Sequence, residues 1–293
     1  MKPQNALAHK GDAIEEWADL HFFRPLGLRV ARALRPTGVS ADQVTLWCLV
    51  VGIIGGHLMV YQAASLNLLG VVLFVISDIL DSADGQLARM RGTSSRFGRV
   101  LDGIADGLRF LNLYVHLLFR AHFAHWGWPG YVLVLAAGLS HSFHGQIVDF
   151  VKNAYQRLGE GHGELDLVEE LAPIEGYGPR QVAQRIYRAY VQRQELLFPN
   201  SIALVRAVKP VATTPAFKAA YVASQRPLLG PLALIAQNIR FPLLAIGAWY
   251  GISWFLWMTV VPLNLIAAAI LVTHELHARA LLVQVKAAVP VRP

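Results

Sequence analysis

The strongest constraint on this chain is a series of six apolar stretches, each about as long as a bilayer is thick. They cover residues 41–62, 66–89, 99–121, 128–151, 230–250 and 252–280. A hydrocarbon core of about 30 Å requires about 20 apolar residues in each helix. Charged residues make up only 15% of the chain, whereas soluble domains carry roughly 25%. We therefore predict an all-α integral membrane protein with six transmembrane helices.

The segments outside these stretches indicate two further features of a single membrane domain that covers residues 1–293. Residues 12–34 have the pattern of an amphipathic helix at the membrane interface, within an N-terminal segment of residues 1–38; an ordinary soluble cap helix is the alternative. Ser40 and Gln43 match a capping box, which places the start of the first span. Residues 154–228 form a long polar insertion between helices four and five.

The insertion contains one strong helical pattern, at residues 180–198. Its arginines, with apolar side chains between them, are typical of a solvated or interfacial helix held by anionic lipid. Substrate gating and partner docking are the alternative interpretations. Residues 159–163 and 173–179 are predicted to be loops because they are rich in glycine and proline.

The basic residues predict the orientation of the protein in the membrane. Arginines concentrate before the first span and between the second and third spans. The connections on the other side of the membrane together contain one Lys or Arg residue, Arg120. By the positive-inside rule, both termini and the loop at residues 89–99 face the cytoplasm, and we expect the insertion on the same side. The net charge of +7 then indicates loops near anionic membrane lipids, and we expect no nucleic-acid partner.

Five acidic residues lie where an apolar span should exclude them. The second and third predicted spans contain Asp78, Asp81, Asp84, Asp102 and Asp106. An unpaired charge near the bilayer centre costs roughly 2.5–3.5 kcal/mol on insertion scales. Acids at such positions therefore indicate a cavity or a bound cation. Simple capping of helix ends does not account for Asp78 and Asp106, which lie deep within apolar sequence.

The spacing of these acids predicts that they converge. Residues three or four apart share one face of a helix, and the connection at residues 91–97 is short, so the second and third spans should be antiparallel neighbours. Carboxylates that meet without nearby compensation would repel one another. One hard divalent cation, or two bridged at about 3.5–4 Å, would relieve this repulsion.

Small and basic residues beside the acids agree with a ligand site. Gly85 and Gly98 permit close approach of a helix backbone or a ligand. Ala88 is small on the same face, and Arg89 is placed to meet an anionic phosphate.

These residues together resemble the signature of the CDP-alcohol phosphotransferases. The pattern runs from Asp81 through Asp84, Gly85, Ala88 and Arg89 to Gly98, Asp102 and Asp106, and every fixed position and spacing agrees. The motif covers residues 81–106, and the layout of spans extends the resemblance to most of the chain. The insertion at residues 154–228 is longer than the resemblance leads us to expect.

The resemblance implies an enzyme that uses Mg²⁺ or Mn²⁺, with two ions expected. It transfers a substituted phosphate from a CDP-linked alcohol to a hydroxyl group and releases CMP. Asp81, Asp84 and Asp102 would bind the metal, Asp106 would act as general base with metal contact as well, and Gly85, Ala88 and Arg89 would hold the CDP moiety. Further candidates for substrate contact are Asp78, Gly98 and Arg240. For Asp78, the sequence is equally compatible with a role as a further metal ligand and with a role as hydrogen-bond acceptor for a residue that binds the metal.

The resemblance also limits the partners that we expect. The donor is predicted to be CDP-diacylglycerol and the acceptor a small polar alcohol, in phospholipid biosynthesis at the cytoplasmic face. Donation from CDP-choline or CDP-ethanolamine to a lipid hydroxyl is the alternative within the family. A membrane cation transporter with an acidic intramembrane site is the alternative outside it. A homodimer is compatible with the sequence.

Overall fold

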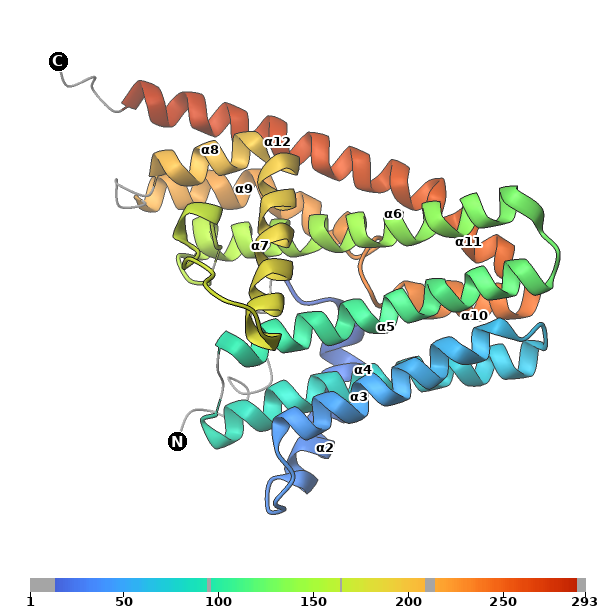
Figure 1. Ribbon diagram of the computed structural model, residues 1–293. Coiled ribbons are helices and arrows are strands. Elements are labelled where there is room, and N and C mark those ends of the chain that lie inside the picture. The colour runs from blue at the N-terminus through green and yellow to red at the C-terminus, as the bar shows by residue number, and fades with distance from the viewer. Residues whose placement is uncertain (1–13, 94–95, 164, 209–213, 289–293) are drawn as a thin grey trace. The chain divides into compact units, whose positions relative to one another are not determined.

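The computed structural model describes residues 14–93, 96–163, 165–208 and 214–288, and for residues 96–102 it describes the helix alone. All regular elements in these ranges are helices (Figure 1), which agrees with the predicted fold class. The chain divides into two compact units. Unit 1 comprises Met1–His141 and Gln237–Val261, and unit 2 comprises Ser142–Ala236 and Pro262–Pro293.

Unit 1 is built on three consecutive long helices with shorter helices against them. α3 packs along both α4 and α5, whereas α2 and α10 pack on α4. The elements of this unit are η1 (Asp19–Phe23), α2 (Arg24–Leu34), α3 (Ala41–His57), η2 (Leu58–Val60), α4 (Ala64–Arg91), α5 (Arg96–Phe123), the first half of α6 (Gly127–Ala154), α10 (Arg240–Tyr250) and α11 (Ile252–Val260).

Unit 2 contains the predicted insertion and the last long helix. It begins in the second half of α6 and continues with η3 (Tyr155–Glu160), η4 (Val168–Glu170), α7 (Pro179–Leu197), α8 (Pro199–Val208), α9 (Pro215–Leu232) and α12 (Pro262–Ala288). α12 packs against α8 and α9. The predicted arginine-rich helix at residues 180–198 is confirmed as α7 within one residue at each end. Of the predicted loop at 173–179, residues 173–178 lie outside helices, whereas residues 159 and 160 of the predicted loop at 159–163 belong to η3.

Three helical segments in the described ranges are long and apolar enough to cross a membrane. They are Ala41–Val60, Ala64–Arg91 and Ile252–Ala287. α5 and α6 contain 28 residues each, which at 1.5 Å per residue is about 42 Å, also longer than a bilayer core. α5 and α6 are long enough to cross a membrane, but they are more polar than the three segments named above and are not counted with them. The count of six spans therefore stays a prediction.

The predicted helix at residues 230–250 is not continuous. α9 ends at Leu232, turns occupy residues 233–239, and α10 begins only at Arg240. Pro227 and Pro231 lie inside the last turns of α9. Because proline lacks the N–H that continues the helical ladder, the helix stops shortly after them. The 11 residues of α10 would cover about 17 Å, which is short of a hydrocarbon core.

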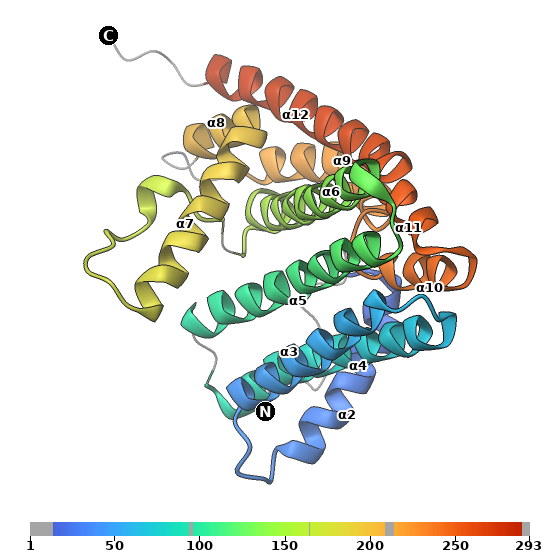
Figure 2. The same cartoon turned by 45° about the vertical axis from the view of Figure 1, so that its right-hand side comes forward.

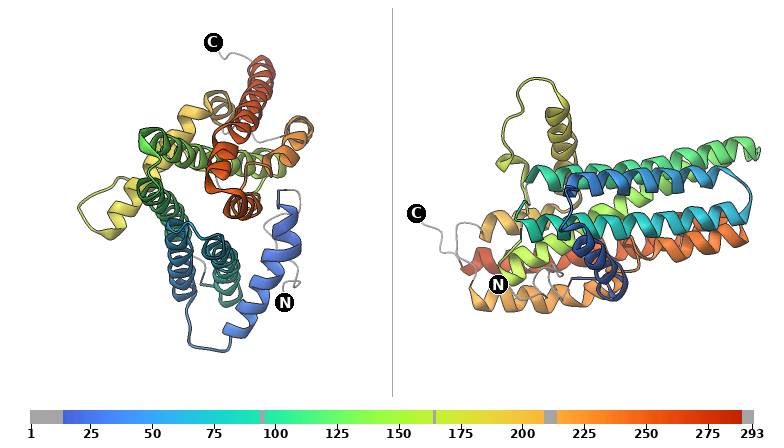
Figure 3. Two further views of the ribbon diagram at one scale, coloured as in Figure 1. Left: turned by 90° about the vertical axis from the view of Figure 1, so that its right-hand side faces the viewer. Right: turned by 90° about the horizontal axis from the view of Figure 1, so that it is seen from below.

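The N-terminal segment agrees in part with the predicted amphipathic helix. Helical structure begins at Trp17 and runs through η1 and α2 to Leu34, whereas residue 12, the predicted start, lies outside the described residues. Trp17 is 73% exposed. Figure 3 shows α2 lying across α3 and α4, as an interfacial helix would lie across spanning helices.

The junction between α2 and α3 is stabilised by a capping box and by hydrogen bonds from Arg91 of α4. The predicted capping box is present: Ser40 Oγ accepts from the Gln43 backbone N–H, and Gln43 Oε1 accepts from that of Ser40. Arg91 donates to the carbonyl oxygens of Leu34 at 2.9 Å, Thr37 at 2.9 Å, Arg35 and Val39. These contacts satisfy carbonyls that the end of α2 leaves without helical partners.

α3 and α4 lie side by side (Figure 3), and glycines permit their closest approach. A Cβ atom added at Gly70 would lie 2.7 Å from the carbonyl oxygen of Gly55, and one added at Gly55 would lie 2.9 Å from that of Gly70. Neither backbone can yield easily, so both positions exclude larger residues.

We expect Gly70→Ala to destabilise the protein, because the added methyl group would force α3 and α4 apart. Overpacking of this kind costs about 1–3 kcal/mol. Thermal unfolding in detergent, followed by fluorescence-detected size-exclusion chromatography, should show a lower midpoint. Gly145→Ala is the matched control, since no atom of the described residues lies within 4 Å of its added Cβ. An unchanged midpoint for Gly70→Ala would contradict the close packing.

Candidate active site

Three aspartates follow one another along the second half of α4. Asp78, Asp81 and Asp84 are spaced by three residues, and their burial differs. The Asp84 residue is only 6% exposed, whereas the side chains of Asp78 and Asp81 are 13% and 30% exposed. Asp106 projects from α5 with its side chain 42% exposed. The site therefore has a buried part and an accessible part.

Arg109 on α5 joins these acids. Its Nη1 atom lies 3.0 Å from Asp78 Oδ1 and its Nη2 atom 3.6 Å from Asp81 Oδ1. The Nη2 atom also donates to Asp106 Oδ1, one helical turn earlier on α5. Carboxylates from two helices thus converge on one guanidinium group, which is only 2% exposed.

Neighbouring residues of α3 and α4 accommodate Arg109. A Cβ atom at Gly52 would lie 2.6 Å from Arg109 Cδ, so only glycine leaves room for the side chain. Arg109 Nη1 also donates to Ser77 Oγ at 2.6 Å. Ser77 Oγ in turn donates to the backbone carbonyl of Cys48 at 2.7 Å. This chain of hydrogen bonds ties the guanidinium group to α3.

Arg109 corrects one expectation from the sequence. We expected the carboxylates to meet without nearby compensation, and the structure shows that a buried cation already lies among them. The signal in the sequence was an arginine three residues after Asp106, within an apolar stretch. Such a residue is a functional candidate by default, and its spacing from Asp106 places both on one face of α5.

Asp84 has a different environment from the other acids. Its Oδ2 atom accepts a hydrogen bond of 2.5 Å from the Thr45 hydroxyl on α3. Thr45 lies one turn inside the capped start of α3. The capping box that fixes this helix start therefore also places the donor for Asp84.

The residues predicted to hold the CDP moiety occupy the next turns of α4. Gly85 and Ala88 are partly exposed. Among the described residues, an added Cβ at Gly85 would meet only Arg89 Nη1, at 3.3 Å. Arg89 itself lies within electrostatic reach of Asp84, Arg24 and Glu15. A small-residue surface thus adjoins a cation at the end of the acid row.

The donor chemistry of the site fits a hard divalent cation. Asp81 and Asp106 are partly exposed, come from different helices, and approach the same nitrogen of Arg109. Carboxylate oxygens are the ligands that Mg²⁺ and Mn²⁺ prefer. Among the side chains that the structure describes, no three His, Cys, Asp or Glu residues are arranged to hold a metal ion. Gly98 and Asp102 of the predicted site are not among these residues, because only the helix backbone is described for residues 96–102.

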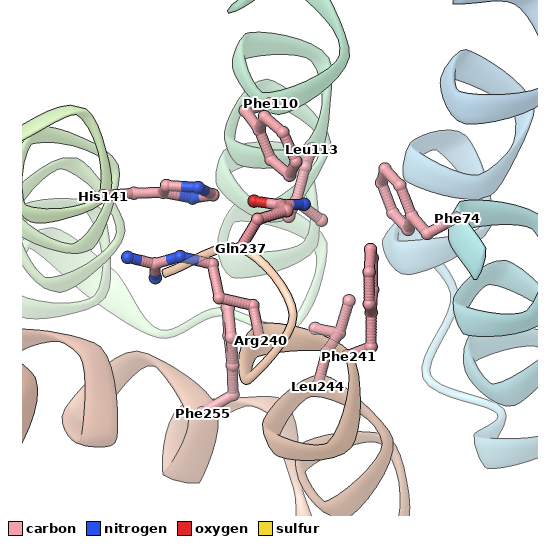
Figure 4. A pocket seen from close by; sticks show the side chains of 9 residues that line it. All are labelled: Phe74, Phe110, Leu113, His141, Gln237, Arg240, Phe241, Leu244 and Phe255. Carbon is pink, nitrogen blue, oxygen red and sulfur yellow. The ribbon is translucent and has the colours of Figure 1, made fainter. Parts of the chain in front are cut away.

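Arg240 lines a small cavity in unit 1, separate from the aspartates (Figure 4). The walls are mostly aromatic and come from α4, α5, α10 and α11, with His141 of α6 and Gln237 beside Arg240. Arg240 is 3% exposed. None of the described aspartates lines this cavity. However, Phe74 lies one turn before Asp78, and Phe110 follows Arg109, so the cavity shares its helices with the acid site.

Other polar residues in the later helices make contacts within the fold. His141 hydrogen-bonds to Tyr114, His144 to Asn264 and His274 to Gln225, all within 3.1 Å. Glu275 accepts from the backbone N–H groups of Asn200 and Ser201 at the start of α8. Packing and capping therefore account for these side chains without a ligand.

Comparison with known proteins identifies the region that contains the site. Residues 39–147 match the family model for CDP-alcohol phosphatidyltransferases. A segment of 130 residues, 44% of this chain, is 29% identical to the phosphatidylinositol phosphate synthase of Mycobacteroides abscessus. The match spans 56% of the length of that protein, so the chain covers about half of this relative.

The matched residues include α3, α4, α5 and most of α6, and they contain all five aspartates together with Arg109. The similarity to CDP-alcohol phosphatidyltransferases therefore covers the segment of this chain, residues 39–147, that carries the acid site.

Proposed function

We propose that this protein transfers a substituted phosphate from CDP-diacylglycerol to the hydroxyl group of a small polar alcohol, with release of CMP. One observation above all supports this reaction: acids from α4 and α5 converge on Arg109, while Asp81 and Asp106 stay accessible. The family match over residues 39–147 supports this reaction class. The relative, named a phosphatidylinositol phosphate synthase, favours a lipid donor and a small polar acceptor.

The carboxylates of Asp81, Asp84, Asp102 and Asp106 would hold the divalent cations, with two Mg²⁺ or Mn²⁺ ions expected. When bound, these ions would neutralise charge on the diphosphate and on the departing CMP. The hydrogen bond from Thr45 holds one oxygen of Asp84 in place. Arg109 holds Asp78, Asp81 and Asp106, so the acids keep their positions before any ligand arrives. In this arrangement Asp78 does not bind the metal itself, and it forms an ion pair with Arg109.

Asp106 is proposed as the general base. The acceptor oxygen attacks the β-phosphorus, its proton passes to the Asp106 carboxylate, and the bond to the bridging oxygen breaks so that CMP leaves with that oxygen. The exposed fraction of Asp106, 42%, allows a hydroxyl group to reach it. A positioned base typically contributes about 10²–10⁴-fold to the rate.

The substrate groups would lie on either side of the acids. Gly85 and Ala88 leave space beside α4 for the nucleotide, and Arg89 supplies a cation for its phosphate. Gly98 would permit close approach where α5 begins. Arg240 is proposed to attract an anionic group on the acceptor, because it is a buried cation in a cavity whose helices also carry the acid site.

The geometry also weighs against a cation transporter. A transport path needs acids distributed across the bilayer. Asp78, Asp81 and Asp106 instead gather in one place, around the buried Arg109. Donation from CDP-choline or CDP-ethanolamine to a lipid hydroxyl stays the alternative within the family.

Release of CMP tests the proposal directly. Purified protein with labelled CDP-diacylglycerol and Mn²⁺ should release CMP with at least one small polar alcohol, and faster with a phosphorylated alcohol than with its neutral form. CDP-choline and CDP-ethanolamine with diacylglycerol form the second arm, and activity there alone would reverse the assigned donor. No CMP in either arm would refute the enzymatic function.

Asp106→Asn should abolish turnover while binding of the CDP-linked donor largely survives, because the amide cannot accept the hydroxyl proton. Turnover is measured by CMP release and binding by isothermal titration with the donor. Asp149→Asn, which alters a carboxylate in unit 2 that bonds to Tyr190, is the control and should keep activity. Joint loss of binding and turnover in Asp106→Asn would count against the assignment as base.

Arg109→Gln should destabilise the protein strongly, since Asp78 and Asp106 would lose a buried cation. Removing one member of a buried ion pair costs about 3–5 kcal/mol. Added Mn²⁺ should raise the thermal midpoint of this variant more than that of the wild type, because the metal would then supply the missing positive charge. The double variant Asp78→Asn with Arg109→Gln should recover part of the lost stability.

The opposite results would be informative. If Arg109→Gln unfolds at the wild-type midpoint, the guanidinium group does not hold the acids. If Mn²⁺ raises both midpoints equally, the metal does not supply the positive charge that Arg109 provides.

A further inference from the structure

α7 exposes one continuous face that combines apolar side chains with arginines. Val182, Ile186 and Leu196 are 51%, 51% and 80% exposed, and Arg185 and Arg193 lie between them on the same side. These positions follow the three- and four-residue spacing of a single helical stripe. We call this stripe, with Ala189 at its centre, the α7 outer face.

The opposite side of α7 holds the helix to the rest of unit 2. Val191 and Gln194 are buried, and the Tyr190 hydroxyl donates to Asp149 Oδ2 at 2.7 Å. Burial and the nearby Asp149 carboxylate raise the pKa of the Tyr190 phenol, so it stays protonated as the donor. Because these contacts fix the helix, the exposed apolar side chains are not explained by the folding of unit 2.

No acidic residue shares the outer face. The single acid of α7, Glu195, is turned inward, where its Oε1 atom accepts from the backbone N–H of Val168 at 2.8 Å and its Oε2 atom lies 3.3 Å from Arg206. The positive charges of Arg185 and Arg193 therefore act outward without an opposing charge from the same helix.

An aromatic side chain extends this surface at the start of α7. Tyr177 is 95% exposed, and the Arg185 guanidinium group lies 4.7 Å from the centre of its ring. Arg185 Nη2 also donates to the carbonyl of Gly176 at 2.9 Å. Tyrosine beside arginine is characteristic of the interface between a bilayer and water.

The direction of α7 agrees with such a location. Figures 1 and 2 show α7 crossing the direction of α12 within unit 2. α12 forms most of the apolar segment Ile252–Ala287, which is long enough to span a membrane. A helix that crosses a spanning helix lies close to the membrane plane, where one amphipathic face can meet lipid.

We propose that the α7 outer face binds an anionic lipid surface. The apolar side chains enter the boundary between headgroups and acyl chains, while Arg185 and Arg193 meet lipid phosphates. An acidic protein partner would complement the charge, but it would not account for apolar side chains on a helix that lies across a spanning helix. α7 lies outside residues 39–147, so this interaction adds a lipid contact beyond the segment that matches the family model.

A fluorescent probe on α7 tests the proposal in the full-length protein. Ile186→Cys, labelled with nitrobenzoxadiazole, is reconstituted into neutral phosphatidylcholine bilayers or bilayers with 30% phosphatidylglycerol, each containing nitroxide-labelled lipid. We expect strong quenching only in the anionic bilayers. Replacing Arg193 by Gln should lower the ratio of lipid-contacting to free probe about five-fold, by the loss of one basic residue near the surface.

Two controls complete the design. The wild type measures background labelling, since its only cysteine, Cys48, is buried. Gln184→Cys places the probe on an exposed position about 160° around the helix from Ile186, and it should be quenched little in either bilayer. Ala189→Cys is a second probe on the outer face if Ile186→Cys folds poorly.

Equal quenching in both bilayers, or none in either, would overturn the proposal. Protection of the probe by an acidic polypeptide such as polyglutamate, without quenching by lipid, would likewise overturn it and identify a protein partner instead.

Discussion

The arrangement of this protein depends on one electrostatic contact, that of Arg109 with the aspartates of α4 and α5. Acids within apolar helices are costly unless a cation compensates them. Arg109 meets Asp78, Asp81 and Asp106 at once, and it does so in a position that only Gly52 leaves open. Three helices therefore have their relative placement tied to a single buried charge.

Contacts around Arg109 also help to position the aspartates. The capped start of α3 positions Thr45 against Asp84, and Arg91 fixes the junction that leads into that helix. Close glycine contacts bring α3 against α4. An acid site made in this way has a buried, hydrogen-bonded side chain at one end, Asp84, and more accessible ones at Asp81 and Asp106. This division suits a site that must keep its ligands in position and still admit two substrates.

In unit 2, polar groups hold the helices of the unit together. Glu275 caps α8, and His274 forms a hydrogen bond with Gln225. Beside them, Phe150 stacks on Phe198 with ring centres 3.9 Å apart. These contacts lie within the fold, so the polar side chains of Glu275 and His274 act in capping and packing. α7 instead presents Arg185 and Arg193 outward. This helix lies outside residues 39–147, and we propose that it contacts anionic lipid.

Several features followed from the sequence alone. Apolar length predicted the long helices, three-residue spacing placed the acids on one face, and Ser40 with Gln43 predicted the start of α3, because each depends only on residues close in the chain. Tertiary structure decided the rest. The pairing of Arg109 with Asp78, 31 positions earlier, and the fit of Arg109 against Gly52 depend on how three helices pack. So does the break between α9 and α10, where prolines allowed a stop that hydropathy did not predict. Local patterns determine helices and faces, but which charges meet depends on contacts between residues distant in sequence.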